Sequence, residues 1–193
     1  MPKLFMLLLG CKPKGRHTEQ HDIFFTISDS LQHCIPDIKI FWPDAGTIHI
    51  DSWREVTESE GYSIEVVPAA SKYKEKLTLF FLNLGGYKPD EFEEYHYKMI
   101  IAAENKTIAI KKAKESAFYK HTGFKGAASH IDDKYGIDVD DLYNIEDILP
   151  ESIKKNYRLR ISENKSPLKD KWHIGYTNLT KLTSEIVNKK SKK

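Results

Sequence analysis

Short apolar runs separated by polar loops characterise the first 67 residues of the chain. Residues 3–9 form a continuous apolar run that ends at a glycine, which predicts a strand buried on both faces. Residues 19–27 alternate instead, which predicts a strand with one polar and one apolar face. On this strand Glu19 and His21 share a face with three apolar side chains, so we expect them to be partly buried at the rim of the core.

A helix and further strands complete the first half. Ser28 is expected to cap a short helix that ends before Pro36, because the residue before a proline disfavours helix. Turn residues bound three more strands, predicted at 37–42, 47–51 and 62–67. His49 and Asp51 then project from the same face of one strand.

A similar pattern returns after residue 76, with strands predicted at 77–83, 93–103 and near 137–143. Thr107 is expected to cap a helix that stops before Gly123. On the strand at 93–103 the apolar side chains share one face, so Glu94 and His96 on the other face are expected in solvent. Half-exposed strands at 157–161 and 172–176 follow, and then a lysine-rich tail from residue 189.

Three motifs occur twice in the same order. LGCKPKGRHTEQH near the N-terminus matches GGYKPDEFEEYH in its glycine, Lys-Pro pair and Glu-x-His. Gly10 and Gly86 are 76 residues apart and the histidines are 75 apart, as if the loop had lost one residue. A His-Ile-Asp triplet follows each copy, at 49–51 and at 130–132. These ordered matches predict an internal duplication.

The expected fold is α+β, with two tandem ββαββ units packed as a pseudo-symmetric pair. Short connectors between neighbouring strands favour antiparallel sheets. The predicted domains are a first repeat at 1–68, a second repeat at 76–163, and a C-terminal extension with a basic tail at 164–193.

Charge and cysteine content restrict the class of protein. The 30 basic and 28 acidic residues nearly cancel, so there is no overall attraction to nucleic acid or to a membrane. Two cysteines are too few for a disulfide framework and suit a reducing compartment. The N-terminal apolar run is too short for a signal peptide or a membrane span. A cytoplasmic protein is therefore expected.

The Glu-x-His pairs are the main candidate sites. Glu19 and His21, with His49 and Asp51 on a neighbouring strand, make a set of nitrogen and oxygen ligands for a divalent metal. The same groups suit acid–base catalysis, or a polar network that only holds the strand ends. The corresponding second set consists of Glu94, His96, His130 and Asp132.

Three other features of the sequence are weaker candidates for a functional site. Lys12 and Arg16, together with Lys14, form a cationic loop that would attract an anion. The acidic stretch around residues 132–141 lacks the alternation of an EF-hand and is typical of a solvated turn. Cys11 beside a histidine would suit a nucleophile, although its counterpart in the second copy is Tyr87.

The stretches HTEQHDIFF, TIHIDSWREV and AFYKHTGFKGAASHIDDKYGIDVDD resemble the bacterial domain-of-unknown-function 1543 family. The resemblance covers roughly residues 3–67 and 77–149. It implies a bacterial protein with a repeated domain, and it implies no activity.

A binding module for a small ligand or another protein is the expected function, because no complete catalytic signature is present. A metal-dependent or acid–base hydrolase that uses the Glu-x-His and His-x-Asp pairs is the alternative. A nucleic-acid binder is a third possibility, supported only by the cations of the loop and tail, and a homodimer is compatible with all three. The first copy is expected to carry the more important site.

Overall fold

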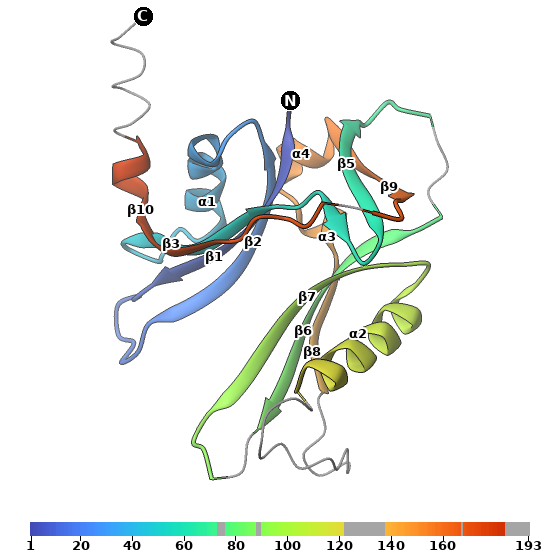
Figure 1. Ribbon diagram of the computed structural model, residues 1–193. Coiled ribbons are helices and arrows are strands. Elements are labelled where there is room, and N and C mark those ends of the chain that lie inside the picture. Colours follow the sequence, from blue (N-terminus) through green and yellow to red (C-terminus); the bar gives the residue numbers. More distant parts are fainter. Residues whose placement is uncertain (73–75, 88–89, 122–137, 167, 184–193) are drawn as a thin grey trace, which may run out of the picture. The chain divides into compact units, whose positions relative to one another are not determined.

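The computed structural model describes residues 1–72, 76–87, 90–121, 138–166 and 168–183 (Figure 1). The fold is α+β, and the described strands pair in antiparallel fashion. There are two compact units, one formed by Met1–Ser71 with Leu149–Lys193 and the other by Lys72–Ile148. In the described ranges no helix is both long and apolar enough to cross a bilayer.

The first unit contains a sheet of four strands in the order β10-β3-β1-β2. Their bounds are Lys3–Cys11 for β1, Gln20–Ser28 for β2, Ile48–Glu55 for β3 and His173–Asn178 for β10. A smaller sheet has the order β4-β5-β9, with bounds Glu58–Ser59, Tyr62–Pro68 and Tyr157–Glu163. β1 lies between two partners and is buried along most of its length, as its apolar run predicts.

The helix of the first unit lies later in the chain than the sequence pattern predicts. A 3-10 turn, Leu31–Cys34, leads into α1 (Ile35–Phe41), so the strand predicted at 37–42 is wrong. Pro36 falls in the first turn of α1, where its missing N–H leaves no helical hydrogen bond unmade. Ile35 and Ile38, three residues apart, are both buried on one side of the helix.

One core cluster of this unit lies on the face of the four-stranded sheet that α1 covers, and Leu4, Met6, Phe25 and Ile27 are buried on the other face. In this cluster alternate residues of β1 pack with Phe24, with the buried side of α1 and with two isoleucines of β3: Phe5, Leu7, Leu9, Cys11, Ile35, Ile38, Ile48 and Ile50. Gly10 therefore faces the opposite side of the sheet, because side chains alternate along a strand.

The second unit has a sheet of three strands in the order β7-β6-β8. The bounds are Thr78–Tyr87 for β6, Glu94–Ala103 for β7 and Asp138–Asn144 for β8. The helix α2 (Lys106–His121) packs on it through Ala109 and Ala113. The helix cap is Asn105 and not Thr107, because the Asn105 side chain accepts a hydrogen bond from Ile108 N at 3.0 Å. The predicted stop at Gly123 lies outside the described residues.

The boundary between the units differs from the predicted one. α3 (Ile145–Ile148) ends the second unit, and α4 (Glu151–Lys154) then leads into β9. β9 pairs along its whole length with β5 of the first unit. The structure therefore assigns residues 149–163 to the first unit and not to a second repeat that ends at 163.

The two sheets share one pairing register around a glycine. Gly10 pairs with His21 of β2 and with His49 of β3. Gly85, and not Gly86, occupies the same place in the second unit, where it pairs with His96 of β7 and with Asp138 of β8. The pairing of β1 with β3 shifts register between Leu8 and Leu9, just before Gly10. The pairing of β6 with β8 shifts at the corresponding place, between Asn83 and Leu84. The two glycines that occupy this place are therefore 75 residues apart, like the two histidines, and not 76 as the sequence match predicts.

Candidate metal centre

Four polar side chains converge at one end of the four-stranded sheet, on the face that lies opposite α1. Glu19 directly precedes β2, His21 is the second residue of that strand, and His49 and Asp51 belong to β3. Because Gly10 pairs with both histidines, the two imidazoles flank it from either side. The register of three strands thus brings together residues that are distant in the sequence.

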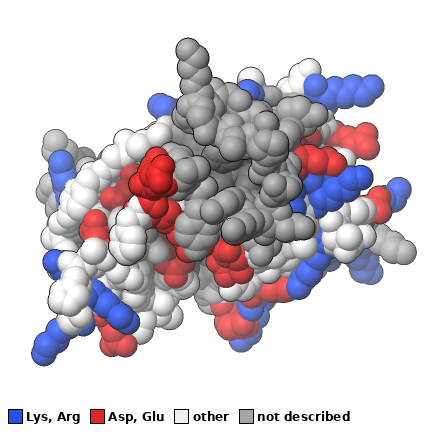
Figure 2. Space-filling model, turned by 90° about the horizontal axis from the view of Figure 1, so that it is seen from below, with Lys and Arg blue, Asp and Glu red and all other residues white. Residues whose placement is uncertain are grey.

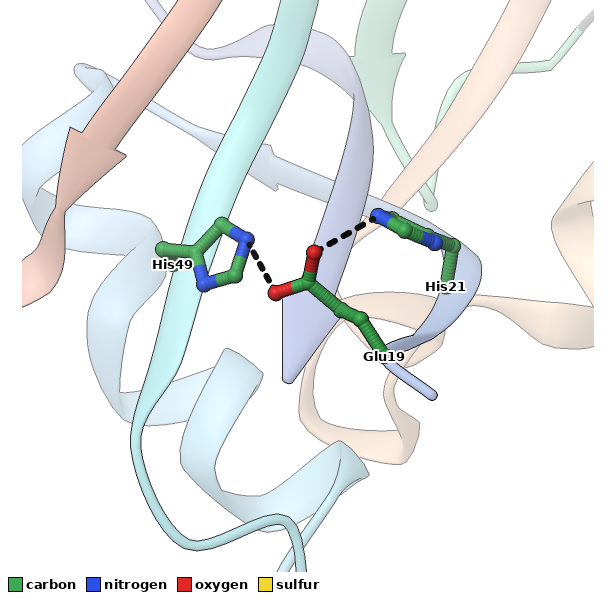
Figure 3. Close-up of side chains that lie close together, drawn as sticks. All are labelled: Glu19, His21 and His49. Carbon is green, nitrogen blue, oxygen red and sulfur yellow. Dashed lines mark ion pairs between the residues drawn. The ribbon is translucent and has the colours of Figure 1, made fainter. Parts of the chain in front are cut away.

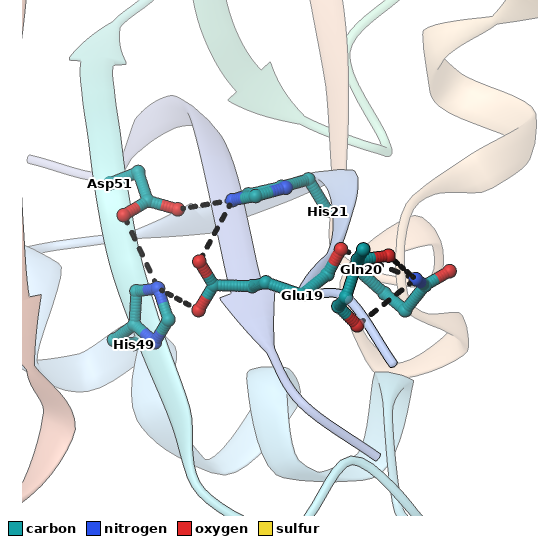
Figure 4. A network of polar contacts seen from close by, with 6 residues as sticks. Glu19, Gln20, His21, His49 and Asp51 are labelled. Carbon is teal, nitrogen blue, oxygen red and sulfur yellow. Dashed lines mark hydrogen bonds and ion pairs between the residues drawn. The ribbon is translucent and has the colours of Figure 1, made fainter. Parts of the chain in front are cut away.

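The four groups form a closed ring in which nitrogen and oxygen atoms alternate. His49 Nε2 lies 3.2 Å from Glu19 Oε1 and 3.2 Å from Asp51 Oδ1. His21 Nε2 lies 3.2 Å from Asp51 Oδ2 and 3.7 Å from Glu19 Oε2. Figure 3 shows the Glu19 carboxylate reaching between the two imidazoles, and Figure 4 adds Asp51, which closes the ring from β3. Each ring nitrogen therefore has a carboxylate oxygen on both sides.

Hydrogen bonding alone does not satisfy this ring. An imidazole Nε2 carries at most one hydrogen, so each histidine can donate to only one of its two carboxylate neighbours. The buried Asp51 Oδ2 lies 3.2 Å from His21 Nε2 but makes no hydrogen bond within the described part of the chain. A ligand that contacts this buried oxygen directly would be stabilising.

The spacing of the donor atoms suits a metal ion. Zinc bonds to nitrogen and oxygen are about 2.0–2.2 Å long, which places neighbouring ligands of a tetrahedral ion about 3.4 Å apart. The neighbouring donors here are 3.2 Å to 3.7 Å apart, on either side of that value. Donor atoms of Glu19, His21 and His49 all lie within 4.8 Å of one another. These three side chains are the group that a single ion could bridge, and Asp51 contacts each of the two imidazoles through a separate oxygen.

Gly10 makes the space in which these groups meet. A Cβ atom at this position would lie 2.6 Å from Asp51 Oδ2 and 2.9 Å from His49 Cε1, and closer still to His49 Nε2. No real Cβ tolerates such distances. Only glycine therefore allows the imidazole and the carboxylate to lie directly over β1.

The ring is anchored on one side and open on the other. The His49 side chain is 7% exposed, whereas the Glu19 and His21 side chains are 47% and 44% exposed. A bound ion would thus be held from the sheet by His49 and approached by solvent from the side of Glu19.

Tyr176 of β10 extends the site in a way that the sequence pattern did not predict. Its ring centroid lies 4.5 Å from that of His49, with the planes tilted by 31°. A β-bulge places it there, since Gly175 and Tyr176 together oppose one residue of β3. The signal available in the sequence was the predicted strand at 172–176, but its partner strand could not be deduced.

The second unit has a related but smaller group. His96 Nε2 lies 3.4 Å from Asp140 Oδ2 and 3.8 Å from Glu94 Oε2. Asp140 lies over Gly85, where a Cβ would come within 2.9 Å of Asp140 Cγ and closer still to Oδ2. His130 and Asp132, the partners predicted for this pair, lie outside the described residues. Asp140 was not predicted as a partner of this pair, because the repeated His-Ile-Asp triplet indicated residues 130–132 instead of β8.

The expected difference in exposure between the two Glu-x-His pairs is absent. Glu94 and His96 are 42% and 36% exposed, no more than Glu19 and His21. Phe25 and Ile27 are buried on the face of β2 that carries His21, as predicted, but this burial does not extend to the Glu-x-His at the start of the strand. In both strands the Glu-x-His lies on the face away from the helix.

Lys12 and Arg16, the other predicted binding residues, are exposed in the loop between β1 and β2. That loop ends at Glu19, so these cations and the ring are neighbours in the sequence. Figure 2 shows acidic and basic side chains interspersed over one face of the molecule, and not gathered by sign. Cys11 is fully buried, and this burial, together with the charge of Glu19, raises the pKa of its thiol, which does not suit a nucleophile.

Comparison with known families supports the resemblance seen in the sequence. Residues 16–66 match the Domain of Unknown Function DUF1543. The DUF1543 segment includes all four residues of the ring, from Glu19 to Asp51. No curated protein matches the chain.

One solved structure shows that the fold occurs elsewhere. The chain resembles the crystal structure of a protein Il1583 from Idiomarina loihiensis, with a TM-score of 0.56 and 20% sequence identity. The alignment covers 93% of this chain and 98% of that chain, so it extends well beyond the DUF1543 segment. The likeness concerns the fold alone.

Proposed function

We propose that the first unit binds one divalent transition-metal ion through Glu19, His21, His49 and Asp51. The observation that carries this proposal is the ring of alternating nitrogen and oxygen donors with 3.2 Å to 3.7 Å between neighbours. Two imidazoles and two carboxylates suit Zn²⁺ and also Mn²⁺, Fe²⁺ or Co²⁺.

Charge favours a cation over the two other interpretations of these residues. Two carboxylates beside two neutral imidazoles carry a net charge of about −2, which a divalent ion cancels while it contacts all four groups. A polar network would leave the buried oxygen of Asp51 with only the imidazole of His21, which Glu19 also contacts. An acid–base pair would need one carboxylate and one imidazole and would not require the second pair.

Coordination number separates a binding role from a hydrolytic one. Four protein ligands complete the shell of a tetrahedral zinc ion and leave no position for a reacting water molecule. We therefore infer a metal-dependent binding module as the main function. An ion that prefers six ligands would keep two positions open, and the half-exposed edge at Glu19 and His21 is where a substrate would enter. Lys12 and Arg16 favour a small anion as that ligand.

The pairing registers support a duplication as the origin of the two units. Both sheets have a central strand with a glycine, a Glu-x-His on the strand after it, and an aspartate on the third strand over that glycine. This arrangement is a stronger argument than the motif matches, because it concerns positions in space.

Metal analysis of the purified protein tests the proposal. We expect one Zn²⁺, Mn²⁺, Fe²⁺ or Co²⁺ per chain, removed by a chelator and restored with a rise in melting temperature. His21→Ala should weaken binding by at least about 100-fold. His33→Ala, which removes an exposed histidine outside the ring, is the matched control. The proposed site would be refuted if the wild-type chain bound none of these ions, or if the His21→Ala variant bound them as well as the wild type does.

A further inference from the structure

We propose that the second unit carries its own metal site, formed by Glu94, His96 and Asp140 and selective for an ion that prefers oxygen ligands, such as Mn²⁺ or Mg²⁺. This inference goes beyond the ring of the first unit, with which it shares no residue. It rests on the donor atoms themselves and on the glycine that makes room for them.

The three donors face a common point. Their ligand atoms all lie within 4.8 Å of one another, and His96 Nε2 is nearest to Asp140 Oδ2 at 3.4 Å. Gly85 permits this arrangement, because any side chain at that position would collide with the carboxylate of Asp140. An exposed acidic cluster alone would not require a glycine at that point, whereas a built site does.

The register explains why this site differs from the first. His49 pairs with Gly10 in the first unit, and Asp138 pairs with Gly85 in the second. The strand position that supplies a second imidazole in one unit therefore holds a carboxylate residue in the other. Loss of an imidazole lowers the preference for zinc, since carboxylate and water ligands suit Mg²⁺ and Mn²⁺.

A neighbouring oxygen adds to this character. Asn83 lies two residues before Gly85, on the same face of β6, and its Oδ1 atom is buried without a hydrogen-bond partner in the described part of the chain. Its amide nitrogen donates to Asp141 Oδ2 at 3.2 Å, which fixes the amide. The face around Gly85 is therefore rich in oxygen atoms.

The exposure of the three side chains indicates how tightly this site would bind an ion. The side chains of Glu94, His96 and Asp140 are 42%, 36% and 34% exposed, and water is available to fill the remaining positions of a six-coordinate ion. Because the described residues of this unit offer no buried imidazole such as His49, the ion is held less firmly than in the first unit. We expect binding that is at least about tenfold weaker than that of the first ring.

The test uses the full chain with the first ring disabled by Glu19→Gln and His21→Ala. Titration with Mn²⁺, followed by electron paramagnetic resonance of the free ion, should still reveal one saturable site. Adding Asp140→Asn should weaken that site by at least about tenfold. Glu104→Gln, which removes an exposed carboxylate of the same unit, is the matched control and should change nothing.

A gain-of-function variant tests the register argument. Asp138→His places a second imidazole opposite Gly85 and should raise the affinity of this unit for Zn²⁺ by at least about tenfold relative to Mn²⁺. No saturable Mn²⁺ site in the disabled chain, or an Asp140→Asn variant that binds normally, would overturn the inference. If the disabled chain binds no Mn²⁺ while the wild-type chain binds Zn²⁺, only this second site fails. If Mn²⁺ binds and the first ring binds nothing, the proposed function fails instead.

Discussion

In the first unit Gly10 is flanked by two imidazoles and covered by carboxylates, whereas in the second unit the described residues place one imidazole, that of His96, beside Gly85. The Glu-x-His pairs are similar in sequence, strand position and exposure. The difference comes from the third strand, which supplies buried His49 in one unit and Asp138 in the other. A Glu-x-His at a strand end is therefore only half of such a site, and the neighbouring strand decides how many nitrogen ligands complete it.

Gly10→Ala should have the largest effect on this comparison. β1 is paired on both edges and cannot move away, so the new Cβ displaces His49 and Asp51. We expect calorimetric titration to show that the metal affinity of the first ring falls by more than about 100-fold. Loss of a residue that only supports a metal ligand costs less, about 10- to 100-fold.

Two other glycines provide the controls for that variant. Gly85→Ala should spare the first ring and damage the second site, because its Cβ meets Asp140. Gly86→Ala meets no atom within 4 Å and should change neither. Equal titration curves for Gly10→Ala and Gly86→Ala would contradict the role of glycine as the floor of the ring.

Glu19→Gln should weaken the first ring by about 10- to 100-fold, because it removes one negative charge that lies beside both imidazoles. Glu94→Gln should leave that ring unchanged. Thermal melts with and without the ion compare the two variants, and His21→Ala with His96→Ala should give the same order. If the paired variants lost equal amounts of stabilisation by the ion, the two units would not differ as the geometry indicates.

Alkaline pH should lower the stability of the first unit through ionisation of its thiols, because both cysteines belong to that unit. Burial raises the pKa of Cys34 to about 12. Between about pH 9 and 12 the unfolded thiol is ionised and the folded one is not, so the free energy of unfolding falls as pH rises, by about 1 kcal/mol per pH unit. Denaturant unfolding at about pH 9 and about pH 11 measures this slope. Cys34→Ala should reduce it, and an unchanged slope would mean that burial does not control the thiol.

Tyr176→Ala should have the smallest effect, a loss of a few-fold in affinity at the first ring. The tyrosine ring packs on His49 and limits its rotation, an aromatic contact worth about 1 kcal/mol. Tyr176→Phe keeps the ring and should bind as the wild type does. A larger loss in Tyr176→Phe than in Glu19→Gln would indicate that the hydroxyl group contacts the ion.

Local patterns predicted much of the fold but not its long-range pairing. The strands around residues 3–9 and 137–143 follow from apolar runs and turn residues. α1 was missed because the isoleucines at 38 and 40 also fit strand alternation, and only packing of Ile38 into the core selects helix. Sequence proximity likewise selected Glu19, His21, His49 and Asp51 correctly as neighbours, since all lie on adjacent strands of one unit.

The misses at the sites have a common physical cause. The triplet at 130–132 matched in letters, but strand register, which places Asp140 over Gly85, is set by pairing with β6. Tyr176 reaches His49 from a strand more than a hundred residues later in the chain. Register and distant pairing depend on the whole sheet, so no local pattern contains them.

The interrupted course of the first unit has a consequence for how the protein is made. β3 acquires β10 as its outer neighbour and β5 acquires β9, and both of these late strands follow the entire second unit in the chain. A ribosome that has released residues 1–71 has thus exposed two strand edges whose partners do not yet exist. The second unit, which is continuous, can close first. The emerging chain must keep those edges from pairing with other molecules until its last segment arrives.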